Sequence, residues 1–222
     1  MRGFLTKGRL SILIILGVLL IDQIIKITVK TGMCLHESIR VCGNWFYIFF
    51  TENNGMAFGM ELFSKLFLST FRVIAVIAIG YYIYKMVKKG VKTGYLVCLS
   101  FIWAGAMGNI IDSIFYGLIF SESYPATFWN QEPAHFVPFG EGYSTWFHGK
   151  VVDMFYFPII ETTWPQWIPF VGGQEFIFFS PIFNFADAAI SCGIIALLIF
   201  YRKDLDHSLS ATLHKKQEEQ TP

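Results

Sequence analysis

Four long apolar stretches constrain the fold of this chain more than any other feature of its sequence. They lie at about residues 10–29, 66–84, 94–116 and 182–201. A helix needs roughly 20 mostly apolar residues to cross a bilayer core of about 30 Å, so each stretch is long enough to span a membrane. Only 15% of the 222 residues are charged, against about 25% in a typical soluble domain. The sequence therefore predicts a multi-pass membrane protein that forms one integral membrane domain, residues 1–222.

The first apolar stretch could also be a cleaved secretory signal, because basic residues precede it. Residues 18–22 lack the small-residue pattern of a cleavage site, which favours an uncleaved membrane anchor.

Basic residues gather in three segments that flank the apolar stretches, and this pattern predicts the orientation in the membrane. They are Arg2, Lys7 and Arg9; Lys85, Lys88, Lys89 and Lys92; and Arg202, Lys203, Lys215 and Lys216. Basic flanks mark the cytoplasmic side. We therefore expect both termini, including the tail 203–222, to be cytoplasmic, and segments 30–65 and 117–181 to face outward.

The two outward-facing segments differ in composition. Residues 39–53 are rich in β-branched and aromatic residues and precede an Asn-Gly turn signal, so they predict a short sheet or hairpin. Residues 117–149 contain many prolines, glycines and aromatic residues, which is typical of an ordered but irregular loop. Cys34 and Cys42 both fall outside the membrane, where a disulfide can form, but the sequence does not decide whether they are bridged.

Ionisable residues within apolar stretches are the main indication of function, because a charge at mid-bilayer costs about 2.5–3.5 kcal/mol. With the predicted topology, four separate parts of the chain bring carboxylates or amides to the outer membrane–water boundary. These residues are Asp22 and Lys26; Asn109 and Asp112; Asp153; and Asn184 and Asp187. We therefore expect one shared site at that boundary.

Several of these residues also have purely structural interpretations. Asp22 and Lys26 are four residues apart, so they share a helix face and could form a structural pair. Arg72 could extend towards the interface or neutralise a carboxylate, and Asp112 could hydrogen-bond across the helix bundle. Asn53 could be an ordinary turn residue. Asp153 and Asp187 are harder to explain structurally, because each lies in strongly apolar sequence without a neighbouring base.

Two carboxylates held close together share a proton, so that one can act as a general base and the other as a general acid. Such a pair can activate water to attack a peptide carbonyl and can then protonate the leaving amine. A transporter is the alternative, since intramembrane acids also mark ion pathways. Transporters usually place their polar sites near the bilayer midplane, often on repeated halves, and no internal repeat is visible here.

Other function classes lack their residues. The net charge of +1 without a basic stripe argues against nucleic-acid binding. GxSxG and HExxH motifs are absent from the sequence, and no histidine lies inside a predicted span, which argues against a serine hydrolase, a zinc protease and a membrane cytochrome. We expect no metal and no other cofactor.

Five motifs, in chain order, resemble those of lipoprotein signal peptidase (signal peptidase II), a family of bacterial membrane aspartyl peptidases. They are Asp22-Gln23-x-x-Lys26, Asn53-Asn54-Gly55-Met56-Ala57-Phe58, Gly108-Asn109-x-x-Asp112, Val151-Val152-Asp153 and Phe183-Asn184-x-Ala186-Asp187. Each motif is weak alone, but the set extends over about residues 8–202 and is specific.

The resemblance implies an activity and a set of roles. Such enzymes remove the signal peptide from diacylglyceryl-prolipoproteins, cutting just before the lipidated cysteine, in the bacterial inner membrane. Asp153 and Asp187 would form the catalytic dyad at the periplasmic face. The residues expected to bind substrate or support the dyad are Asp22, Lys26, Asn53, Gly55, Asn109, Asp112 and Asn184. The expected partners are prolipoproteins, membrane lipids and inhibitory cyclic peptides of the globomycin type.

The resemblance also implies a fold, which we predict as an all-α membrane protein: a four-helix bundle with a small extracytoplasmic β-cradle and elaborated periplasmic loops. Two features depart from the family pattern. Ser113 stands where an arginine usually follows the third motif, so Arg72 or Lys26 would have to supply that cation. Residues 118–149 and 158–180 look longer than usual and are expected to form surface elaborations.

Overall fold

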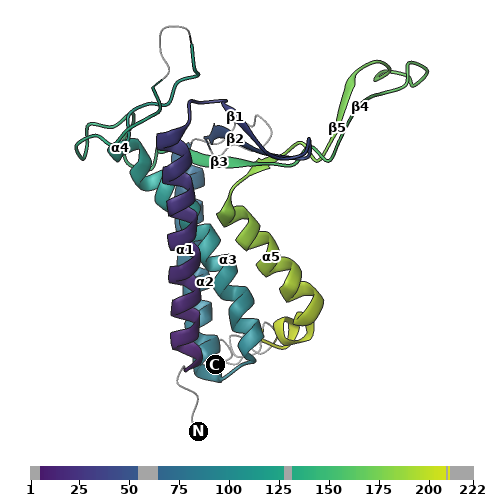
Figure 1. The fold of residues 1–222 in the computed structure, drawn as a ribbon. Coiled ribbons are helices and arrows are strands. Elements are labelled where there is room, and N and C mark those ends of the chain that lie inside the picture. Colours follow the sequence, from purple (N-terminus) through teal and green to yellow (C-terminus); the bar gives the residue numbers. More distant parts are fainter. Residues whose placement is uncertain (1–5, 55–64, 128–131, 209, 211–222) are drawn as a thin grey trace. The chain divides into compact units, whose positions relative to one another are not determined.

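The computed structural model describes residues 6–54, 65–127, 132–208 and 210 (Figure 1). Its long helices are α1 (Lys7–Gly32), α2 (Lys65–Lys89), α3 (Thr93–Ile111) and α5 (Phe185–Phe200). Three helical segments are long and apolar enough to cross a membrane: Lys7–Gly32, Ser69–Lys89 and Thr93–Ile119. The first three predicted spans therefore coincide, within a few residues, with helices that could cross a membrane.

The fourth predicted span, 182–201, differs from the structure at both ends. Ile182 and Phe183 form strand β6, so the helix starts only at Phe185. After Phe200 the chain bends by 88° into a short helix, Arg202–Ser208, and the two helices pass the length and hydropathy test only when taken together. The described residues thus contain three candidate spans, or four if this bent pair is one span.

The prediction of an all-α fold is wrong, because the segments between the spans pair as strands. One antiparallel sheet has the order β1-β2-β3-β6, and a second contains only two strands. The strands are β1 (Ser38–Cys42), β2 (Phe46–Asn53), β3 (Val151–Tyr156), β4 (Ile160–Thr163), β5 (Glu175–Phe178) and β6 (Ile182–Phe183). The predicted hairpin over 39–53 is confirmed as β1 and β2. The elaboration at 158–180 contains the unpredicted hairpin of β4 and β5.

The chain divides into two compact units. The first contains Met1–Leu20, Ile74–Met107 and Ala186–Pro222. Its apolar core includes Met86, Tyr95 and Leu96, all nearly inaccessible to solvent. α3 and α5 approach closely at glycines, because a Cβ atom on Gly105 would collide with the carbonyl oxygen of Ala186. Such small residues allow helix backbones to pack directly in membranes.

The second unit contains Ile21–Val73 and Gly108–Phe185. Its core packs the end of α1 against the central strands of the four-stranded sheet. The buried members are Val29, Met33, Phe50, Tyr116, Phe120, Val152 and Met154. The predicted loop at 117–149 is irregular over most of its described part. Cys34 and Cys42 are both free cysteines, so the structure has no bridge between them.

Candidate functional site

Asp153 lies in β3, a central strand of the four-stranded sheet, and only 4% of its surface is exposed. The strand VVDMFY is short and almost wholly apolar, which is typical of a strand buried on both faces. A buried carboxylate is costly without hydrogen-bond donors. The side-chain amide of Asn184 provides one, because its Nδ2 donates to Oδ1 of Asp153 at 2.6 Å.

Asn184 also connects Asp153 to a larger polar network. Its Nδ2 donates to Oδ1 of Asn109 at 3.1 Å, and Nζ of Lys26 donates to the same oxygen at 2.8 Å. Asn184 and Lys26 are fully buried. The orientation of the Asp153 carboxylate is therefore coupled, through two amides, to a lysine on α1.

Lys26 lies between two buried carboxylates. Its Nζ is 3.1 Å from Oδ2 of Asp22, one turn earlier on α1, and 2.8 Å from Oδ2 of Asp112. The predicted pairing of Asp22 with Lys26 is thus confirmed. Lys26 also supplies Asp112 with a cation although Ser113 replaces the usual arginine. Removing one member of such a buried set leaves the others uncompensated.

Gln23 completes this cluster, although it was not among the predicted site residues. Its Nε2 donates to Asp22 at 3.1 Å and to Asp112 at 3.0 Å, and its Oε1 accepts from the hydroxyl of Tyr116 at 3.2 Å. An uncharged amide inside an apolar helix, directly after Asp22, was the sequence signal that could have identified it.

The backbone around Asp112 departs from an ordinary helix. After Ile111 the chain forms a π-helix, η1 (Asp112–Tyr116), and then one short turn, α4 (Gly117–Ile119). π-helical turns inside α-helices frequently occur at functional sites. Carbonyl groups at a helix end need external donors. The loop at 137–149 supplies them: the backbone N–H of Gly149 donates to Ser113 at 2.9 Å, and that of Ser144 donates to Gly117 at 2.8 Å.

Only glycine fits at position 149, because the backbone there packs too closely on the helix for a side chain. A Cβ atom at this position would collide with the backbone carbonyl oxygen of Asp112. The loop can therefore pack directly on the segment that carries Asp112. In addition, the backbone N–H of Val152, next to Asp153, donates to Oδ2 of Asp112 at 3.4 Å.

The remaining predicted residues have different positions. Asn53 ends β2, is exposed, and is paired in register with Val151. Gly55 lies outside the described residues. Asp187 is half-buried in the first turn of α5 and belongs to the first unit, whereas Asp153 belongs to the second. In all, the second unit brings together six predicted residues: Asp22, Lys26, Asn109, Asp112, Asp153 and Asn184.

A second buried ionic cluster, which was not predicted from the sequence, lies one helical turn after Lys26. Nζ of Lys30 donates to Oε1 of Glu52 at 2.5 Å and to Oγ of Ser123 at 2.8 Å. Nζ of Lys150 lies 3.3 Å from the other oxygen of Glu52. The four-residue spacing of Lys26 and Lys30 was the available signal.

Electrostatics at this second cluster favour a charged Lys150. Burial alone would lower the pKa of Lys150, but the carboxylates of Glu52 and Glu122 outweigh it and raise the pKa above its ordinary value. The hydroxyl of Tyr143 accepts a hydrogen bond from the backbone N–H of Lys150 at 2.7 Å, and burial raises the pKa of this tyrosine. Among the described residues, no group of three or more histidine, cysteine or acidic side chains could hold a metal ion.

Apolar spanning helices together with a buried network of acids, amides and one lysine define a multi-pass membrane protein with an enzyme-like site. Two solved structures of bacterial membrane enzymes share the fold. One has a TM-score of 0.56 and 26% sequence identity, and the match covers 85% of this chain and 90% of the chain of that structure. The other has a TM-score of 0.57 and 26% sequence identity, and the match covers 89% of this chain and 90% of the chain of that structure.

The chain belongs to the signal peptidase II family. The model of this family, described as Signal peptidase (SPase) II, matches residues 14–202. It is 54% identical over 205 residues to the lipoprotein signal peptidase of Porphyromonas gingivalis, covering 90% of this chain and 88% of that protein. The lipoprotein signal peptidase of Amoebophilus asiaticus is 35% identical over 191 residues, covering 83% and 74%. The family resemblance seen in the five motifs is thus confirmed, and a protease is favoured over a transporter.

Proposed function

We propose that the chain is an aspartyl endopeptidase that cuts diacylglyceryl-prolipoproteins just before the lipidated cysteine. Asp153 and Asp187 would form the catalytic dyad and would act on one water molecule. The proposal rests on membership of the lipoprotein signal peptidase family and on one observation above all: a carboxylate 4% exposed, Asp153, oriented by the amide of Asn184 at 2.6 Å.

Chain connectivity supports the pairing of the two acids. Asp187 follows Asn184 by three residues, so covalent geometry limits the distance between their Cα atoms to about 11 Å. Because Asn184 itself donates to Asp153, the sequence keeps Asp187 within reach of the same place. Asp187 also lies in the first turn of α5, where the helix dipole favours a negative charge.

In the proposed reaction the two carboxylates share one proton. The ionised carboxylate removes a proton from the water molecule. At the same time the water oxygen attacks the carbonyl carbon that precedes the lipidated cysteine. The protonated member donates to the cysteine nitrogen as the C–N bond breaks, which gives a free carboxylate and a free amine. No covalent enzyme intermediate is needed.

The buried network would position this dyad. Asn184 and Asn109 orient Asp153, and the cluster of Asp22, Lys26 and Asp112 fixes Asn109. Asn53 and Gly55 are proposed to bind the extended substrate, since Asn53 ends a strand beside β3.

The remaining elements of the proposal concern topology and ligands. The protein would lie in the bacterial inner membrane as one membrane domain with four spans and cytoplasmic termini. Its active site would face the periplasm, with membrane lipids around the substrate helix, and globomycin-type cyclic peptides would compete with the prolipoprotein. The proposed reaction uses no cofactor.

Amide replacement of each acid tests the dyad. Asp153→Asn and Asp187→Asn keep the side-chain shape but remove the ionisable group, so each should abolish cleavage of a diacylglyceryl-prolipoprotein. The unfolding midpoint in detergent shows whether each variant stays folded. Full activity in a folded variant would exclude that residue from the dyad.

A further inference from the structure

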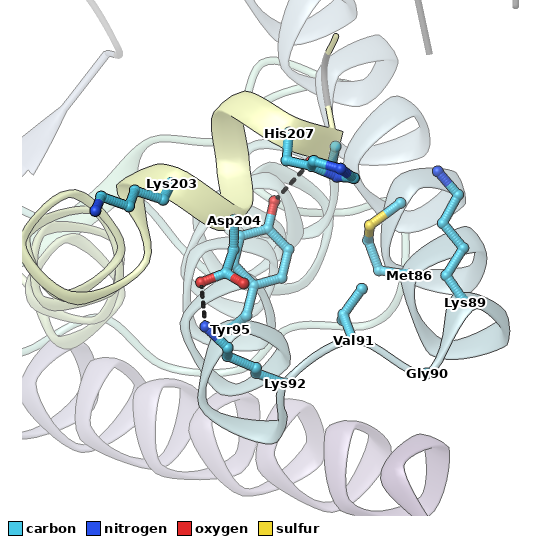
Figure 2. Close-up of a pocket in the computed structure, with 10 residues that line it drawn as sticks. Met86, Lys89, Gly90, Val91, Lys92, Tyr95, Lys203, Asp204 and His207 are labelled. Atoms are coloured by element: carbon cyan, nitrogen blue, oxygen red, sulfur yellow. Dashed lines mark hydrogen bonds and ion pairs between the residues drawn. The ribbon is translucent and has the colours of Figure 1, made fainter. Parts of the chain in front are cut away.

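A cavity of about 760 Å³ lies in the first unit, and none of the residues that line it is proposed to take part in catalysis. Its walls come from the end of α2, the turn at 90–92, the start of α3, and the short helix Arg202–Ser208. Figure 2 shows Met86, Val91 and His207 around the cavity, with Lys89 on one side and Lys203 on the other. Charged groups therefore surround a partly apolar hollow.

The floor of the cavity is buried and hydrogen-bonded. At most 1% of the surface of Tyr95 and of Met86 is exposed. The hydroxyl of Tyr95 is 2.6 Å from that of Tyr82, and both hydroxyls hydrogen-bond to Ser208 on the short helix. Leu205 packs against the same apolar core. These contacts fasten the short helix to α2 and α3, so the cavity is already formed in the protein by itself.

The charges lining the cavity are predominantly positive. Three lysines and one aspartate line it, so these side chains carry a net charge of +2. Lys92 is 2.9 Å from Asp204, so these two cancel. Lys89 and Lys203 provide the remaining charge, and both are exposed. In addition, Nζ of Lys7 donates to the backbone carbonyl of Gly90 at 2.7 Å, which offsets the negative end of α2 at the rim.

The cavity also lies at the end of an apolar helix that is long enough to span a membrane. The apolar span Ser69–Lys89 ends at its edge, and the short helix turns away from the axis of α5 by 88° at the same end. Basic pockets at the ends of membrane helices suit phosphate headgroups, while apolar walls such as Met86 and Val91 suit the glycerol and the first acyl carbons.

We propose that this cavity binds the phosphate headgroup of an anionic phospholipid. The phosphate would lie between Lys89 and Lys203, with His207 as an additional hydrogen-bond partner. The chemistry shared by a lipid headgroup and a free phosphate ion is the phosphate itself, so the experiment must distinguish these two sources. The proposed catalytic residues take no part in this site.

The test uses the full chain in nanodiscs or mild detergent, with native mass spectrometry to count bound phosphatidylglycerol against phosphatidylcholine. The test variant is Lys89→Ala/Lys203→Ala. The matched control is Lys85→Ala/Lys88→Ala, which removes the same charge from lysines that lie over the rings of Tyr81 and Tyr84, outside the cavity lining. A basic residue near a membrane surface strengthens anionic lipid binding about fivefold.

Both variants lose the same general attraction to an anionic surface, since each loses two lysines. Only the test variant also loses direct hydrogen bonds from charged groups to the phosphate, so we expect it to bind phosphatidylglycerol at least about tenfold more weakly than the control. Prolipoprotein cleavage should be unchanged in both. Equal loss in the two variants, or no loss in the test variant, would overturn the proposal. Displacement of the lipid by millimolar inorganic phosphate or glycerol phosphate would show a soluble phosphate site instead and would also overturn it.

Discussion

Replacement of Lys26 by methionine tests the buried network most directly. Lys26→Met keeps the length of the side chain but removes the charge that lies 3.1 Å from Asp22 and 2.8 Å from Asp112. All three side chains are at most 1% exposed. The variant therefore leaves two carboxylates buried without their cation, and breaking a buried ion pair in this way costs about 3–5 kcal/mol. We expect the free energy of unfolding to fall by that amount.

The measurement is reversible unfolding in detergent micelles, followed by tryptophan fluorescence. Lys92→Met is the matched control, because Lys92 pairs with Asp204 at the surface, where its side chain is 67% exposed. An exposed pair contributes about 0–1 kcal/mol, so the control should change little. The double variant Lys26→Met/Asp112→Asn should recover part of the loss, since it removes one uncompensated charge. A loss below about 1 kcal/mol for Lys26→Met would refute the reasoning.

Two further predictions concern the contacts that hold Asp153 and Asp112. Asn184→Ala removes the donor to Asp153, and since a hydrogen bond to a charged group contributes about 1.5–3 kcal/mol, the cleavage rate should fall by roughly 10- to 150-fold; kinetics within threefold of the wild type would contradict this. Gly149→Ala should destabilise the protein by about 1–3 kcal/mol, because its Cβ would collide with the carbonyl oxygen of Asp112. The control is Gly32→Ala, because a Cβ atom on Gly32 meets no atom within 4 Å, so this variant should be nearly neutral in the same unfolding assay. Gly140 is unsuitable as a control, because its positive φ of 92° would strain an alanine there.

The sequence predicts the long helices well, because each contains an apolar run of about 20 residues, which has the length of a membrane-spanning helix. Helical spacing also predicts the contact between Asp22 and Lys26, which needs only one turn of α1. Residues 39–53 were predicted as a hairpin from their β-branched and aromatic content, and β1 and β2 confirm it.

Other features depend on contacts between distant segments and could not be predicted in this way. Ile182 and Phe183 continue an apolar run, but pairing with Tyr156 and Phe155 makes them a strand. A short apolar run fits a strand or a helix equally well. The π-helix at Asp112–Tyr116 depends on backbone hydrogen bonds that no residue pattern specifies. The partners of Lys30 come from β2 and from residue 123, far along the chain.

The order in which the chain is synthesised gives the pairing within α1 a further consequence. α1 precedes Asp112 in the chain, so if the chain is inserted into the bilayer as it is synthesised, α1 enters before Asp112 is available to Lys26. Asp22, four residues earlier on the same helix, already offsets that charge, and an acid placed before a lysine at this spacing is the favourable orientation. Lys30, near the end of the helix, can extend its ammonium to the interface until Glu52 is made. The first segment can thus be inserted alone with its charges provisionally balanced, and the later segments then complete the arrangement.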